Sequence, residues 1–170
     1  MSNVTWFYDE ETGRYVVKGA RILFPNFEGA EQQYNQAGKR NFRLDLPEDL
    51  AEELKGRGVY VRERPNQDGD GSLYLVKIGI YQDADVRLLT GGTLSTLSYD
   101  NFEMIDREFR KGHIINGQIN LEFHISRNTR VANGSLYARL DTIVMPLRKS
   151  HLLAEYESAM EDDLPFADAN

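Results

Sequence analysis

The chain has 170 residues, of which 41% are hydrophobic, and 20 basic against 27 acidic residues give a formal net charge of −7. This length fits one domain with a sizeable core, and the absence of cysteine excludes a disulfide scaffold, a thiol nucleophile and an iron–sulfur cluster. No apolar run reaches the length of a membrane span and no secretory signal pattern begins the chain, so we expect a cytoplasmic protein with no membrane partner.

Strand patterns dominate the first half of the chain. Trp6 to Tyr8 and a turn over 9–13 predict a hairpin with the region over 14–24, which closes at Pro25. This region is either one strand or two strands separated by Gly19. A long polar loop over 28–39 follows, and loops of this length in compact domains tend to be functional.

The later elements complete a mainly β pattern. Apolar alternation predicts strands over 41–46, 59–64, 73–81, 119–125 and 136–145, with short helices over 47–56 and 100–109 and a hairpin turn at 133–134. Short strands joined by hairpins fit a small barrel better than a parallel sheet. We therefore predict an OB-fold-like antiparallel barrel of five to six strands, with an antiparallel α+β sheet as the alternative.

The negative charge is concentrated at the C-terminus. Six acids and no base lie between Glu155 and Asn170, which leaves 20 bases and 21 acids in residues 1–154. Such an acidic segment cannot offset its ordering entropy by burial. We therefore divide the chain into a domain over residues 1–150 and an acidic, largely disordered tail over residues 151–170.

Patterns for metal binding and catalysis are incomplete. The stretch from Asn66 to Gly71 begins like a calcium loop, but Lys77 stands where the bidentate Glu of that pattern belongs. The three histidines are far apart, and no nucleophile elbow or Gly-rich phosphate loop occurs. We predict a non-catalytic protein without metal or cofactor, and rank a metal-dependent nuclease built from distant carboxylates third among the hypotheses.

Two consecutive strands combine aromatic and basic side chains on one face. Alternation places Tyr60, Arg62 and Arg64 together, and Lys77 and Tyr81 lie opposite the apolar face of the next strand. Rings stack on exposed bases and cations bind phosphates, so this surface suits single-stranded nucleic acid. The same pattern also occurs on an ordinary solvated sheet, and these strands by themselves favour neither interpretation.

Further basic residues lie in the predicted loops, and the loops at the rim of an OB-fold bind its ligand. Lys39 and Arg40 end the polar loop that contains Tyr34, and Arg127 and Arg130 precede the hairpin turn. The candidate DNA-binding residues are therefore Tyr34, Lys39, Arg40, Tyr60, Arg62, Arg64, Lys77, Tyr81, Arg127 and Arg130.

The first third of the chain contains a motif that resembles the opening of phage-encoded OB-fold single-stranded DNA-binding proteins. The motif consists of Ala20 to Phe27, then Tyr34-Asn35, and then Gly38 to Phe42. This resemblance covers the first third of the chain. It implies largely sequence-independent binding of single-stranded DNA during phage-type replication or recombination in the host cell cytoplasm. The alternative, from a different class, is a protein-binding β-barrel of a phage particle or replisome with no nucleic-acid role.

The tail carries a second resemblance. Asp162, Asp163, Leu164, Pro165 and Phe166 are similar to the acidic tip, ending in Ile-Pro-Phe, of bacterial single-stranded DNA-binding proteins. There the tip recruits replication and repair enzymes, which implies partner binding through these five residues. Four residues follow Phe166 here, so its terminal carboxylate is not available in the same form. The short tail also resembles the acidic C-terminal tails of phage single-stranded DNA-binding proteins, which compete with DNA for the protein's own groove. The sequence does not decide whether the protein forms a homodimer.

Overall fold

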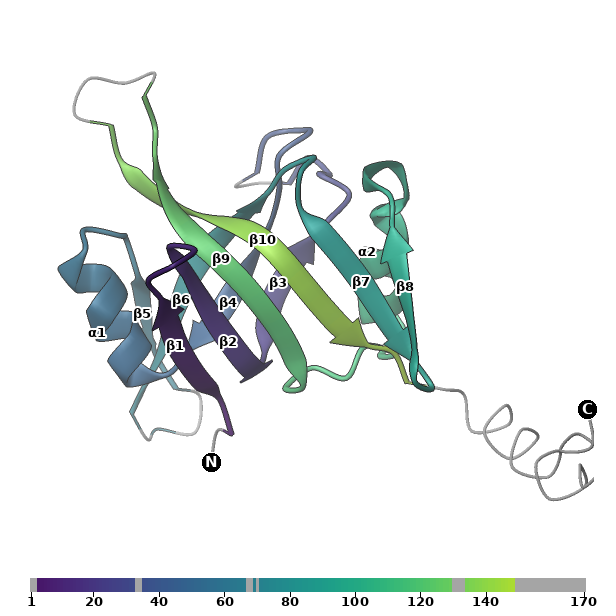
Figure 1. Ribbon diagram of the computed structural model, residues 1–170, viewed down its shortest axis with the longest axis horizontal. Helices are drawn as coiled ribbons and strands as arrows, with labels where there is room; N and C mark the ends of the chain where they lie inside the picture. Colours follow the sequence, from purple (N-terminus) through teal and green to yellow (C-terminus); the bar gives the residue numbers. More distant parts are fainter. Residues whose placement is uncertain (1–2, 33–34, 67–68, 70, 130–133, 149–170) are drawn as a thin grey trace, which may run out of the picture.

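The computed structural model describes residues 3–32, 35–66, 69, 71–129 and 134–148 (Figure 1). Within these residues, two α-helices and ten strands follow one another, with a 3₁₀ turn at Tyr99–Asn101. The strands are β1 (Thr5–Asp9), β2 (Arg14–Ala20), β3 (Ile22–Asn26), β4 (Arg40–Leu46), β5 (Arg62–Pro65), β6 (Ser72–Ile80), β7 (Asp85–Thr90), β8 (Thr93–Leu97), β9 (Ile119–Arg127) and β10 (Leu136–Pro146), and the helices are α1 (Glu48–Gly56) and α2 (Glu103–Arg110). The predicted tail over 151–170 lies outside the described residues, so the domain boundary stays a prediction.

All ten strands join one sheet in which β10 is central. The main path runs β1-β2-β9-β10-β6-β4-β3, while β5 pairs with β6 and the β7–β8 hairpin pairs with β10. Most neighbours are antiparallel, but β10 runs parallel to both β6 and β7. Among the described strands the hydrogen-bonded path does not close. The predicted mainly β, OB-like fold is confirmed, with more strands than the five or six expected.

The core lies on the inner face of this sheet, because side chains along a strand alternate between its two faces. Phe42 and Leu44 of β4 pair with Ile78 and Val76 of β6, and all four are buried in the same cluster. The residues between them face the other side of the sheet. This alternation therefore decides which side chains of β4 and β6 remain available on the outer face.

Helix α1 packs beside the sheet through its apolar side. Leu50, Ala51 and Leu54 are buried, acids occupy the first turn and Lys55 the last, as the helix dipole favours. The Tyr15 hydroxyl of β2 donates a hydrogen bond to Glu53 at 2.7 Å and accepts one from Arg57 just after the helix at 2.9 Å. One buried phenol thus ties α1 to the sheet.

Helix α2 fixes the start of the long loop after β3. The buried carboxylate of Asp106 accepts the backbone N–H groups of Phe27 and Glu28, both at 2.9 Å. Phe27 in turn stacks on Phe42 of β4, with ring centroids 5.6 Å apart. The predicted second helix is therefore present, although its first residues form the 3₁₀ turn.

Three features differ from the predicted elements. The strand predicted over 59–64 begins only at Arg62, because 59–61 contribute no more than an isolated bridge at Val59. The strand region over 14–24 is two strands divided at Arg21, while Gly19, with φ of +73°, lies inside β2 at its register shift against β9. The β7–β8 hairpin was not predicted, because β8 is largely exposed and carries no apolar alternation. Within the described part of the chain, no helix is long and apolar enough to span a membrane.

Candidate nucleic-acid interface

A groove of about 800 Å³ lies where the beginning of β4, the end of β6 and the beginning of β10 meet. Its other walls come from Tyr60, from Tyr99 before α2, from the end of β9 at Arg127 and from the loop residues 128, 129 and 135. The loop ending at Lys39 completes the rim. The groove therefore gathers residues from segments that are far apart in the sequence.

Six of the ten candidate residues line this groove: Lys39, Arg40, Tyr60, Lys77, Tyr81 and Arg127. Arg62 and Arg64 do not line it and lie exposed on β5, beside β6. Tyr34 and Arg130 are outside the described residues. The structure thus brings together most of the candidates, and whether they bind DNA stays a prediction.

The shared face predicted for the two strands is present. In the register of β5 and β6, Arg62 lies beside Leu75, and Lys77 is two residues further along the same face. Tyr60 precedes β5 at the groove wall, with 79% of its surface exposed. Its ring is consequently open to a planar ligand such as a nucleobase.

Arg40 has a local partner that the sequence did not reveal. Its guanidinium lies 3.6 Å from the ring centre of Tyr99 and donates a hydrogen bond to the Tyr99 backbone carbonyl. A half-buried arginine stacked in this way mainly fixes the position of an aromatic wall. Lys39, Lys77 and Arg127 remain as the more accessible cations of the groove.

Sequence reasoning also missed an aromatic and basic cluster on β10. The ring centres of Tyr137 and Tyr81 lie 6.4 Å apart, and the Arg139 guanidinium lies 4.2 Å from the Tyr81 ring centre. Burial raises the pKa of Tyr81, so its hydroxyl is neutral at ordinary pH. The signal was available, because Tyr137 and Arg139 alternate with buried Ala138 just as the rings and cations of the earlier strands do.

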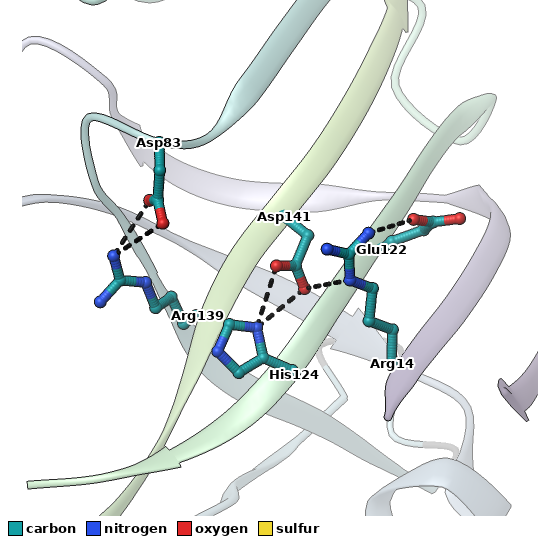
Figure 2. A network of polar contacts seen from close by, with 6 residues as sticks. All are labelled: Arg14, Asp83, Glu122, His124, Arg139 and Asp141. Carbon is teal, nitrogen blue, oxygen red and sulfur yellow. Dashed lines mark hydrogen bonds and ion pairs between the residues drawn. The ribbon is translucent and has the colours of Figure 1, made fainter. Parts of the chain in front are cut away.

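Acids balance several cations of the outer sheet face, one of them at the groove wall (Figure 2). Arg139 donates to both carboxylate oxygens of Asp83 at 3.0 Å. On β9 and β10, His124 contacts Asp141 at 2.9 Å, and Arg14 of β2 lies 3.5 Å from both Asp141 and Glu122. These pairs contrast with Lys39 and Lys77, which take part in no ion pair among the described residues.

Residues 8–91 match the model of a family described as "putative phage ssDNA-binding domain". Over these residues the chain is similar to that family. This confirms the resemblance predicted from the opening motif. The family consists of DNA-binding domains and not of enzymes, in agreement with the expectation of a non-catalytic protein.

The ssDNA-binding domain match extends from the end of β1 to the turn after β7. It contains Lys39, Tyr60, Lys77 and Tyr81 of the groove. The remaining wall of the groove, with Arg127 and β10, lies C-terminal to the match. The groove is therefore completed by a part of the chain that the family model does not cover.

Two solved structures of one phage protein are similar to this chain. The single-stranded DNA-binding protein from bacteriophage Enc34, as a C-terminal truncation, has 13% identity and a TM-score of 0.49, covering 82% of this chain and 88% of that one. The same phage protein in complex with ssDNA has 13% identity and a TM-score of 0.48, covering 82% and 89%. No curated protein matches the sequence significantly.

Proposed function

We propose that this protein binds single-stranded DNA without catalysis and largely without regard to sequence. The observation that carries the proposal is the groove in which exposed rings and cations lie side by side. Bases would stack on Tyr60 and Tyr81, each stacked base contributing about 1–3 kcal/mol. Lys39, Lys77 and Arg127 would bind phosphates and release counterions. The match to a phage ssDNA-binding domain supports this function independently.

We also propose a setting for this binding: the coating of unwound DNA during phage-type replication or recombination in the host cytoplasm. The resemblance of the opening motif supports it. Stacking accepts every base, because every base has a π face, and a protein that covers DNA during replication must tolerate any sequence. The groove's mixture of rings and cations fits that requirement.

The acidic tail belongs to the same proposal. Its six acids would compete with phosphates for the cations of the groove, and the segment Asp162 to Phe166 would recruit replication or recombination enzymes. The tail lies outside the described residues, so the support for this role comes from its sequence and its charge. Phe166→Ala tests recruitment: the parent chain should retain a replication enzyme that the variant loses, and equal retention would contradict the proposal.

Titration of the full chain with a fluorescent oligo-dT strand at low salt tests the main proposal. We expect clear preference for the single strand over a duplex of equal length, and an affinity that falls linearly on a log–log plot against salt. Equal affinity for duplex, or no binding, would contradict the proposal. The absence of any binding would favour the alternative of a protein-binding barrel.

A further inference from the structure

The outer face of β4, β5 and β6 carries a group of cations that extends beyond the groove. In the strand register, Arg43 of β4 lies beside Lys77 of β6, and Arg62 of β5 lies beside Leu75 on the same face. We call Arg43, Arg62 and Lys77 the outer cationic cluster. Lys77 also lines the groove, so the cluster and the groove are continuous.

Two side chains of this face, Leu75 and Arg43, are packed rather than loosely solvated. Leu75 is only 2% exposed, although it faces away from the core and is not part of the core cluster. One Nη atom of Arg43 is buried and has no hydrogen-bond partner. Buried polar atoms are nearly always paired, so an unpaired donor of a charged group indicates a missing acceptor.

Acids do not neutralise the outer cationic cluster in the part of the chain that the structure describes. None of its three members takes part in an ion pair there, and Asp45, the acid on the same face of β4, pairs with Arg21 at 3.2 Å. Burial lowers the pKa of Arg43, and the nearby Arg62 lowers it further. Burial also lowers the pKa of Lys77, followed by the charges of Arg43 and Lys39. An anion bound here would relieve this repulsion.

We propose that Arg43, together with Arg62 and Lys77, binds a phosphate of the DNA backbone outside the groove. The strand would then leave the groove across β6 toward β5. This inference rests on the proposed function and extends it. Tyr60 lies at the groove wall two residues before Arg62, so a base stacked on its ring would place a neighbouring phosphate near the cluster. The guanidinium fork suits phosphate oxygens, which accept two parallel hydrogen bonds.

The salt dependence of oligo-dT binding tests this inference, because each phosphate contact on a single strand contributes about 0.7 to the slope of log K against log salt. We expect Arg43→Gln to reduce the slope by about 0.7 and Arg43→Lys to restore most of it. Lys18→Gln removes the same charge from β2, which two strands separate from β6, and should keep the parent slope.

The possible failures are distinguishable. If the parent chain does not bind oligo-dT, the proposed function itself is wrong. If the parent binds and Arg43→Gln keeps the slope of the Lys18→Gln control, the function stands and the outer phosphate site is overturned. Should Arg43→Gln fail to fold, which thermal unfolding shows, Arg62→Gln on the exposed strand β5 decides by the same slope.

Discussion

At the scale of single residues, the groove depends on rings that are held open to solvent. Tyr60 is the most exposed large hydrophobic residue among those described, and its neighbours Val59 and Val61 are buried. The buried valines anchor the backbone, so the fold here does not depend on packing of the Tyr60 ring. The stacking surface is thus separable from the stability of the fold.

Replacement of Tyr60 by alanine tests that separation. We expect Tyr60→Ala to weaken oligo-dT binding by about 1–3 kcal/mol, the contribution of one stacked base, while the free energy of unfolding changes little. Tyr60→Phe should retain most of the affinity, since the ring remains. Phe7→Ala is the control, because Phe7 is 52% exposed on β1 and does not line the groove. Equal binding by Tyr60→Ala and Phe7→Ala would show that this ring takes no part.

Asp106 illustrates a residue whose role is structural. Its carboxylate accepts two backbone N–H groups at the start of the loop that ends at the groove. Asp106→Asn leaves one N–H facing an amide donor, so we expect a loss of about 1.5–3 kcal/mol in the free energy of unfolding by urea. Asp100→Asn, an exposed change at the 3₁₀ turn, should cost little. Similar losses in both variants would contradict this assignment.

At the scale of elements, α1 is held to β2 by the Tyr15 phenol between Glu53 and Arg57. Burial, followed by the hydrogen bond to Glu53, raises the pKa of Tyr15 to about 12 from an ordinary value of 10.0. The folded state therefore keeps this proton more firmly than the unfolded state does. The stability linked to Tyr15 is complete below pH 10 and is lost as the pH rises toward 12.

Urea unfolding between neutral pH and pH 12 measures this linkage. We expect the parent chain to lose stability above pH 10 more steeply than Tyr15→Phe, which has no phenol to ionise at this position. The variant should be less stable at neutral pH by roughly 1 kcal/mol, because two hydrogen bonds are lost. Parallel stability curves for the two proteins would rule out the raised pKa of Tyr15.

At the scale of the whole molecule, the uneven charge explains how a protein with a net charge of −7 can bind a polyanion. The acids of the tail account for most of the excess, and the rest of the chain is nearly neutral. Within it, acids pair with Arg14 of β2 and Arg139 of β10, whereas Lys39 of the groove and the outer cationic cluster take part in no ion pair among the described residues. The distribution of charge therefore matters more than its sum.

Removal of residues 155–170 tests the competition between tail and DNA. We expect the truncated chain to bind oligo-dT more tightly than the full chain at low salt, because six tethered negative charges are absent. The difference should shrink as salt rises and screens the charges. Phe166→Ala in the full chain keeps every acid and should bind like the parent. Unchanged affinity of the truncated chain at low salt would refute the competition.

The mainly β fold and the residues of the shared face could be predicted from the sequence, because the side-chain period of a strand is a local property. Tyr60, Arg62, Lys77 and Tyr81 follow that period, as do the core residues between them. The hairpin β7–β8 could not be predicted in this way, since backbone hydrogen bonds hold an exposed strand that has little apolar alternation. Stacking of Arg40 on Tyr99 could not be predicted either, because the two residues are 59 positions apart in the sequence.

The sequence by itself thus determined which side chains share a face and where the charge of the tail lies. Tertiary structure decided which strands become neighbours, including the parallel pairing of β10 with β6 that brings Tyr137 to Tyr81 and completes the groove. It also placed Arg43 beside Lys77 and left its buried nitrogen without a partner. Pairing between distant strands depends on burial and backbone hydrogen bonding across the whole chain. The local alternation of side chains therefore does not predict which distant strands pair.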